Sequence, residues 1–349
     1  MLGDAKRADE LMALLERYAP FLSRAMREAW EAGQLSFVLE EVERLLREGR
    51  VGEAVDLVLT GSDPFFRAKA ENGLRAAFLA ASEWAWTRDM PKMPQTRVFR
   101  TMFDQLNPKT IDAMRMNELR MVQQVREETK SGLLALMEGA LERGVNPRDV
   151  ARKLRTEPGF GLTASQEQQV QRFAAYLRDV HNKRSLKELG LGLERSFNVN
   201  AQGKPVDGIN RWRLRDLRYD QMLARAQRNN KPLTDDQIDR MVKAYRRQAI
   251  RLRSETIART EMVKAGALGS REAWRQLQEN GYFPKGVRRF WFTALGERVC
   301  PICKPMPRIN GAGRGLDEPF MTVDGGFVDC PPVHPGCRCV VFVRPAETK

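Results

Sequence analysis

The sequence is poor in histidine, which limits the catalytic centres that it can build. Only two of its 349 residues are histidines, His181 and His334. Neither begins a His-x-Glu element, which the zinc deaminases need for a ligand and a general acid–base. His181 is followed by Asn-Lys-Arg, which has no metal-ligand spacing, so a multi-histidine nuclease centre is not supported. A Gly-x-x-x-x-Gly-Lys phosphate loop is also absent, which argues against an ATP-driven motor. We therefore expect a protein that is not an enzyme.

Long apolar runs are missing as well. No run of about eighteen or more apolar residues occurs, which argues against a membrane-spanning helix. The start of the chain, Met1 to Glu10, lacks the apolar core of a secretory signal. We therefore expect synthesis in a reducing cytoplasm, where clustered cysteines hold metal more often than they form disulfides.

Most of the chain carries the signals of α-helix. Leu11, Leu14, Leu15 and Tyr18 keep helical spacing up to Pro20. Helix starts are marked by a capping residue before proline or by a capping box, at Asp63-Pro64, Asn107-Pro108, Asn146-Pro147, Thr163–Gln166 and Thr234–Gln237. These signals predict helices over 64–86, 108–143, 147–155, 164–181 and 235–280. Residues 182–233 are interpreted as mixed, with loop or an extended arm.

The last sixty or so residues change character. Val287–Thr293 and Cys339–Val343 are rich in aromatic and β-branched residues, which favour strands, and a loop rich in Gly and Pro lies between them. We expect a mainly α, elongated multi-helix protein that ends in a small β module. The predicted regions are an N-terminal helical part, a helical core and the β module, over 1–106, 107–286 and 287–349. A joint is expected at Met90–Pro94.

All five cysteines lie in the last fifty residues. Cys300 and Cys303 form a Cys-x-x-Cys knuckle, and His334 and Cys337 have the same spacing. Two such halves complete a tetrahedral metal site, which predicts one structural Zn²⁺ per chain. Cys339 can replace either His334 or Cys337 as a ligand, and Cys330 is the cysteine that the site does not need. The four ligands are drawn from Cys300, Cys303, His334, Cys337 and Cys339. The alternative is a group of small buried thiols or an opportunistic disulfide.

The chain is strongly basic, with a net charge of +14. Residues 181–260 hold 19 Lys and Arg against 9 Asp and Glu. This density suggests a polyanionic partner, with nucleic acid as the leading candidate, contacted through its phosphates without sequence preference. Aromatic residues are too few here for base stacking. The candidate contacts are Arg211, Arg213, Arg215, Arg218, Lys243, Arg246, Arg247, Arg251 and Arg253. The alternative is a solvated basic face on helices.

Several elements in the last third of the chain occur in a recognisable order. They are Ile257-Ala-Arg-Thr-Glu261, Ala265, Gly269, Trp274, Trp291, Arg298-Val-Cys-Pro-Ile-Cys303 and His334-Pro-Gly-Cys-Arg-Cys339. In order and rough spacing this region resembles the phage Mu F-like head morphogenesis, or minor head protein, family. The resemblance is strongest over 245–342 and looser back to about residue 110. It does not extend to the first hundred residues.

The resemblance implies a virion protein of tailed bacteriophages, located inside the head near the portal vertex. Such proteins associate with the portal, enter the procapsid in few copies and assist capsid assembly, DNA packaging and ejection. The expected partners are the portal protein, capsid or scaffold proteins and double-stranded DNA. Arg259, Thr260 and Glu261 belong to the family motif. Two roles stay open for Arg259 and Glu261: an ion pair that fixes the β module on the long helix, or a solvated helix face.

A phage-delivered effector, toxin or enzyme is the alternative, with residues 1–106 as its extra domain. This region contains no histidine, no cysteine and no phosphate loop. Its apolar residues follow helical spacing, which is more typical of a core or a docking face than of a catalytic groove. They include Leu35, Val38, Val42, Leu45 and Leu46.

Overall fold

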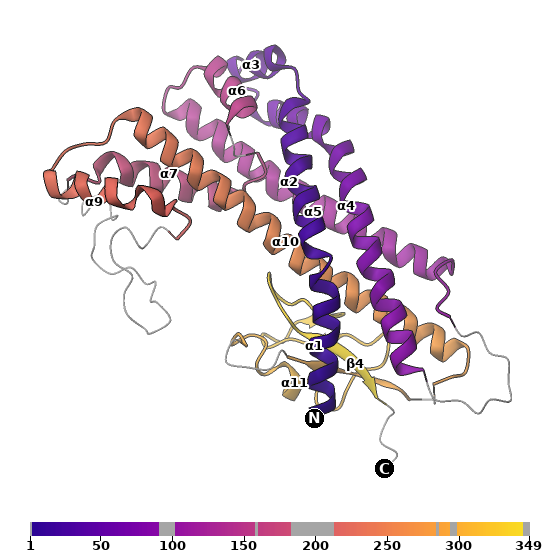
Figure 1. Ribbon diagram of the computed structural model, residues 1–349. Helices are drawn as coiled ribbons and strands as arrows, with labels where there is room; N and C mark the ends of the chain where they lie inside the picture. The colour runs from indigo at the N-terminus through magenta and orange to yellow at the C-terminus, as the bar shows by residue number, and fades with distance from the viewer. Residues whose placement is uncertain are drawn as a thin grey trace. The chain divides into compact units, whose positions relative to one another are not determined.

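The computed structural model describes residues 2–90, 102–157, 160–182, 213–283, 286–293 and 299–344, without the side chains of residues 2–5 and 61–71. The fold is mainly helical, with a few short strands near the C-terminus, as the sequence predicts (Figure 1). The helices are α1 (Leu2–Glu16), α2 (Ala19–Leu35), α3 (Leu39–Arg47), α4 (Val51–Asp89), α5 (Pro108–Glu142), α6 (Pro147–Thr156), α7 (Ala164–Asp179), α9 (Asp220–Asn229), α10 (Asp235–Glu279) and α11 (Met306–Ile309). A 3₁₀ turn, η2 (Leu217–Tyr219), precedes α9.

Four of the five predicted helices begin at their capping signals. The Asn146 side chain accepts a hydrogen bond from the backbone N–H of Arg148 at 2.9 Å, which caps α6. The capping box before α7 has both of its bonds, at 3.1 and 3.2 Å between Thr163 and Gln166. The box before α10 is also complete. These local bonds satisfy backbone donors that a helix start leaves free.

The start predicted at Asp63-Pro64 is wrong, because α4 begins at Val51 and runs through the proline. A proline inside a helix removes one backbone donor and costs stability. Buried apolar residues continue on both sides, from Val58 and Leu59 to Leu74 and Phe78. Packing of a long apolar face therefore outweighs the local break. The predicted joint at Met90–Pro94 lies outside the described residues apart from Met90, which follows the end of α4.

The chain divides into two compact units. Unit 1 consists of Met1–Ala29, Phe65–Gln124 and Ser254–Lys349, and unit 2 consists of Trp30–Pro64 and Val125–Arg253. The boundaries fall inside α2, α4, α5 and α10. This division differs from the three consecutive regions predicted over 1–106, 107–286 and 287–349. Sequence signals mark where a helix ends, but they do not mark where an unbroken helix changes its packing partners.

The strands of unit 1 form two small antiparallel pairs. β1 (Arg288–Phe292) pairs with β4 (Val340–Arg344), so that Trp291 lies opposite Val341. β2 (Phe320–Met321) pairs with β3 (Phe327–Val328). The predicted strands at 287–293 and 339–343 are thus confirmed.

The β module does not have a core of its own. One buried cluster joins Trp86 of α4 and Trp274 of α10 with Trp291, Phe320 and Val341 of the strands. Arg7 of α1 lies over the ring of Phe342 in β4, with 4.6 Å between the guanidinium carbon and the ring centroid. The module is therefore held on a helical frame from three distant parts of the sequence (Figure 1).

Unit 2 has a separate core between α7, α9 and the first half of α10. Phe173 and Tyr245 stack there with their ring centroids 4.6 Å apart. η2 and α9 lie in the described part of the segment 182–233, which the sequence predicts to be mixed. The stretches interpreted as loop or an extended arm, Leu189–Leu193 and Asn198–Pro205, lie outside the described residues. In the part of the chain that the structure describes, no helix combines the length and apolarity needed to cross a bilayer.

Candidate metal centre

The Cys300–Cys303 knuckle is a tight turn that places two thiols together. The backbone N–H groups of Cys303 and Lys304 donate to the Cys300 carbonyl at 3.1 and 3.0 Å. The N–H of Cys303 also lies 3.3 Å from the Cys300 sulfur. The chain then enters α11, whose first residue, Met306, is fully buried. This burial anchors the knuckle to the core of unit 1.

The second half of the centre is a turn that leads into β4. The Cys337 N–H donates to the His334 carbonyl at 3.2 Å, and Gly336 has a φ of +72°. Glycine suits this position because side chains with a Cβ rarely adopt the left-handed region. Cys339 ends the turn directly before β4, which is paired with β1. The strand pairing therefore sets the position of this half.

The two halves meet through their donor atoms. His334 Nε2 lies 3.0 Å from the sulfur atoms of both Cys300 and Cys303. The Cys303 and Cys337 sulfurs are 3.7 Å apart. Two groups of donors, each within 4.8 Å of one another, share Cys303. They are Cys300, Cys303 and His334, and Cys303, Cys337 and Cys339.

This geometry suits a metal ion. Thiolates about 2.3 Å from a tetrahedrally coordinated ion lie about 3.8 Å from one another. The Cys303–Cys337 separation is close to that value. Among the described residues, all five predicted ligands lie in the two donor groups, whereas Cys330 is buried outside them. The cluster can therefore hold a metal ion.

A hydrogen bond fixes the imidazole in the form that a metal needs. His334 Nδ1 lies 2.9 Å from the Pro335 carbonyl oxygen. A carbonyl only accepts, so Nδ1 carries the proton and the Nε2 lone pair faces the thiols. Such an outer partner orients the ring and raises the basicity of the ligating nitrogen.

The thiols cannot all ionise without a cation. A hydrogen bond with Cys339 lowers the pKa of Cys337 to about 5. Burial, together with the neighbouring Cys337 charge, raises the pKa of Cys303 to about 12. Burial opposes ionisation of Cys300, but the hydrogen bonds from Cys303 and Ile302 and the charge of His334 together outweigh it, so the pKa of Cys300 is lowered. One buried thiolate thus hinders the next, and a bound cation would remove this repulsion.

The Ile257–Glu261 segment of α10 contacts the centre through Thr260. Thr260 Oγ1 accepts a hydrogen bond from the Gly336 N–H at 2.9 Å. Arg259 is exposed, and no ion pair links it to the β module among the described residues. Glu261 is only 5% exposed and lies 4.0 Å from Lys264. Thr260 thus contributes a hydrogen bond between α10 and the β module, while Arg259 lies on a solvated face and Glu261 does not.

Two of the predicted phosphate contacts are internal to unit 2. Arg246 forms two hydrogen bonds with the buried carboxylate of Glu167, at 2.7 and 2.6 Å. Arg253 is 4% exposed and contacts Glu128 at 3.0 Å as well as the carbonyl of Gly161. Both guanidiniums hold helices of unit 2 together, so the expectation that they contact DNA is wrong. Sequence spacing alone does not show that these arginines face inward.

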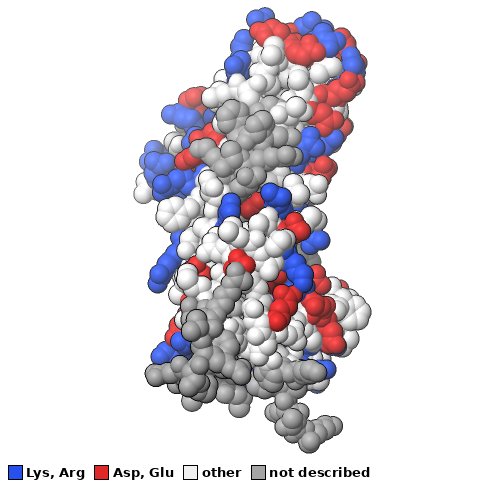
Figure 2. All heavy atoms as spheres, turned by 90° about the vertical axis from the view of Figure 1, so that its right-hand side faces the viewer, with Lys and Arg blue, Asp and Glu red and all other residues white. Residues whose placement is uncertain are grey.

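The other basic candidates differ in exposure. Arg215 and Lys243 are partly buried and paired with Asp220 and Asp239, both at 2.8 Å. The exposed candidates are Arg213, Arg218, Arg247 and Arg251. Arg211 lies outside the described residues. On the face drawn in Figure 2, Lys and Arg side chains lie in several separate groups interspersed with Asp and Glu.

The sequence signals do not single out one buried residue that holds the loops of the module together. Arg289 is 1% exposed and donates to the carbonyls of Gly315, Asp329 and Glu318. Burial lowers the pKa of Arg289 to about 10. The two-residue period of a strand could have indicated this burial, because Arg289 lies on the same inner face of β1 as Trp291.

Comparisons of the chain with protein-family models, with curated proteins and with solved structures gave no match. The function is therefore argued from the residues and their geometry.

Proposed function

We propose that the metal is zinc, bound once per chain in a structural role. Four thiolates, or three thiolates with one imidazole, are ligand sets that zinc takes in structural sites, and the five candidate donors can supply either. Cys303, Cys337 and Cys339 are each at most 3% exposed, which leaves little room for a substrate at the ion. Zinc would join the knuckle to the strand that follows Cys339 and so hold the β module closed.

We further propose that the protein is a minor head protein of a tailed bacteriophage, with no enzymatic activity. It would lie inside the head near the portal vertex and assist capsid assembly, DNA packaging and ejection. The proposal rests on the order of the Mu F-like motif elements. The observation that carries it is the hydrogen bond between Thr260 and Gly336. This bond joins the Ile257–Glu261 element to the His334–Cys339 element across 76 positions of sequence.

Binding to the portal tests this role. The purified protein is mixed with the portal protein encoded beside it, and native mass spectra are recorded. We expect a discrete complex with one zinc per copy of this chain. Zinc without a portal complex would overturn the portal role and keep the structural metal. A chain that binds neither zinc nor the portal would overturn both the structural zinc and the portal role.

We propose duplex DNA as a second partner, contacted through the exposed arginines of the basic segment. Phosphate contacts release counterions, so the affinity should fall by about tenfold or more between low and physiological salt. Replacing both Arg247 and Arg251 by Glu should weaken binding to duplex DNA at a given salt concentration. The matched control reverses two exposed arginines outside the basic segment, Arg47 on α3 and Arg152 on α6. Equal losses in both variants, or binding that ignores salt, would exclude this surface.

A further inference from the structure

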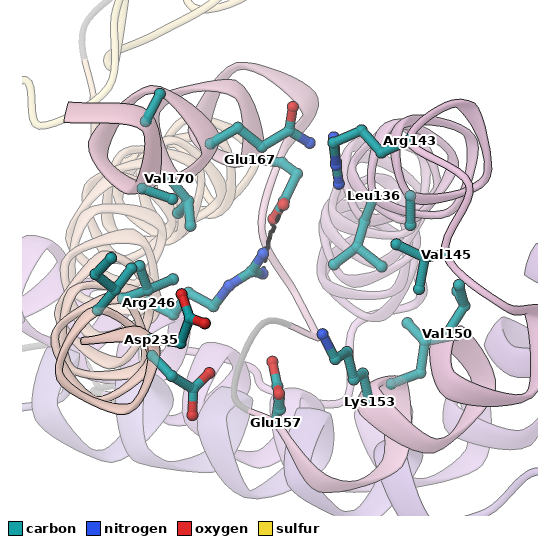
Figure 3. Close-up of a pocket in the computed structure, with 18 of the residues that line it drawn as sticks. Leu136, Arg143, Val145, Val150, Lys153, Glu157, Glu167, Val170, Asp235 and Arg246 are labelled. Carbon is teal, nitrogen blue, oxygen red and sulfur yellow. Dashed lines mark hydrogen bonds and ion pairs between the residues drawn. The ribbon is translucent and has the colours of Figure 1, made fainter. Parts of the chain in front are cut away.

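Unit 2 contains a cavity of about 590 Å³ that the proposed function does not use. Residues of α5, α6, α7 and α10 line it (Figure 3). Its apolar walls include Leu136 and Ala140 on one side and Val170 and Ala174 on another. Cavities of this size between helices are typical of sites for small molecules.

The polar pair between the walls is already satisfied. Glu167 and Arg246 both line the cavity and bind each other through two hydrogen bonds. Figure 3 shows this pair crossing from α7 to α10. A buried carboxylate and guanidinium that satisfy each other leave no net charge there. The pair therefore offers a rigid, neutral surface to a ligand.

After the Glu167–Arg246 pair, the charges at the cavity leave a small positive excess once Lys243 beside it is counted. Lys243 is paired with both Glu157 and Asp239, so these two carboxylates keep one net negative charge between them. Of the other charged lining residues, Asp235 is acidic, whereas Arg143, Lys153 and Arg178 are basic. Within the described part of the chain these three cations have no ion-pair partner. Arg143 and Lys153 belong to the α5–α6 side, and Figure 3 shows their nitrogen atoms directed toward the cavity.

We infer that this cavity binds a small amphipathic anion, with an apolar chain or ring that ends in a carboxylate or phosphate. The apolar body would lie between Leu136, Val170 and Ala174, and the anionic group would face Arg143 and Lys153. Burial of the body supplies most of the affinity at roughly 25 cal/mol per Å². The cations select the sign of the head group. This site is independent of the metal centre and of the proposed role in the phage head.

Titration calorimetry of the full chain with decanoate tests the ligand class. We expect saturable binding of one decanoate per chain. Acetate has the charge without the chain, and decyltrimethylammonium has the chain with the opposite charge. Both should bind at least about tenfold more weakly, a difference of about 1.4 kcal/mol. Absence of decanoate binding, or equal binding of the cationic probe, would overturn the inference.

Two kinds of variant test the location. Ala174→Phe adds a ring where only a methyl group lines the cavity, and Ala140→Phe does so from α5 in case the first does not fold. Either should abolish decanoate binding while helicity is retained. Lys153→Glu reverses a lining charge, and Arg152→Glu makes the same change at its exposed neighbour, which does not line the cavity.

We expect Lys153→Glu to weaken decanoate binding by about three- to tenfold, within the range of exposed ion pairs. Arg152→Glu should change it by less than about twofold. Equal losses in the two variants would mean that only the net charge matters. Unchanged binding in the cavity-filling variants would place the ligand elsewhere. Either result would overturn the site.

Discussion

The hydroxyl of Thr260 on α10 is bonded to the backbone of Gly336, between the metal-ligand positions His334 and Cys337. Its oxygen accepts from the Gly336 N–H at 2.9 Å, and its O–H donates to the Thr256 carbonyl at 2.7 Å. The second bond fixes the direction of the hydroxyl, so that a lone pair faces the loop. The long helix thereby positions the second half of the metal centre.

Replacing Thr260 by Ala should loosen the metal-binding loop. The change leaves the Gly336 N–H without its protein acceptor, which we expect to cost about 1 kcal/mol of unfolding free energy. Metal transfer to a chromogenic chelator should become faster. Thr260→Ser keeps the hydroxyl and serves as the control. Equal rates of metal loss in the Ala and Ser variants would show that the hydrogen bond does not hold the loop.

Replacing Cys303 by Ser should abolish stoichiometric metal binding, because this thiol belongs to both donor groups. The unfolding temperature should fall with it, since binding to the folded chain alone stabilises that chain. Cys330→Ala removes a buried thiol outside the groups and should retain the metal. Elemental analysis of the reduced protein measures the metal content of both variants. Metal retained by the Cys303 variant would contradict the assignment.

Replacing Gly269 by Ala should destabilise unit 1. An added Cβ would lie 2.3 Å from the Phe78 carbonyl oxygen and 2.8 Å from the Ser82 hydroxyl, so α10 and α4 must separate. We expect a loss of about 1–3 kcal/mol, as for overpacked cores. Gly52→Ala is the matched control, because nothing lies within 4 Å of its Cβ position in α4. That variant should gain stability by about 0.5–1 kcal/mol from the better helix former. Chemical denaturation measures the unfolding free energies of the Gly269→Ala and Gly52→Ala variants.

Replacing Asp89 by Ala should weaken the contact of α1 and α4 with the core of unit 1. Asp89 accepts from the indole N–H of Trp274 at 2.8 Å and forms an ion pair with Arg7. The change leaves the indole N–H of the buried Trp274 and the guanidinium of the partly buried Arg7 without this acceptor, at a cost of about 2–3 kcal/mol. Asp89→Asn keeps an acceptor for Trp274 and should cost less.

The same residue predicts a pH dependence. Burial raises the pKa of Asp89 even though Arg7 opposes it. A carboxyl group with a raised folded-state pKa contributes stability at low pH, and that contribution is lost as pH rises through the window above about 4. Asn does not titrate. The unfolding free energy of Asp89→Asn, relative to wild type, should therefore increase from pH 3.5 to neutral pH. A difference that changes in the opposite direction would contradict this.

Local signals determined much of this protein. Asn146 and the Thr163–Gln166 box cap their helices with bonds between residues two or three positions apart, so their effect is visible in sequence. The Cys/His cluster was also predictable, because each of its halves is a turn of a few residues that brings its donor atoms together. That these residues hold zinc stays a prediction.

Tertiary structure alone decided which residues meet across long distances. Pro64 lies within a continuous helix because the apolar face extends on both sides of it, and the unit boundaries follow packing rather than helix ends. Arg246 and Arg253 look like solvent-facing cations in sequence, but they bind carboxylates of other helices. Spacing along a helix gives the direction of a side chain about the axis. Whether that direction faces solvent or a neighbouring helix depends on contacts between residues far apart in the chain.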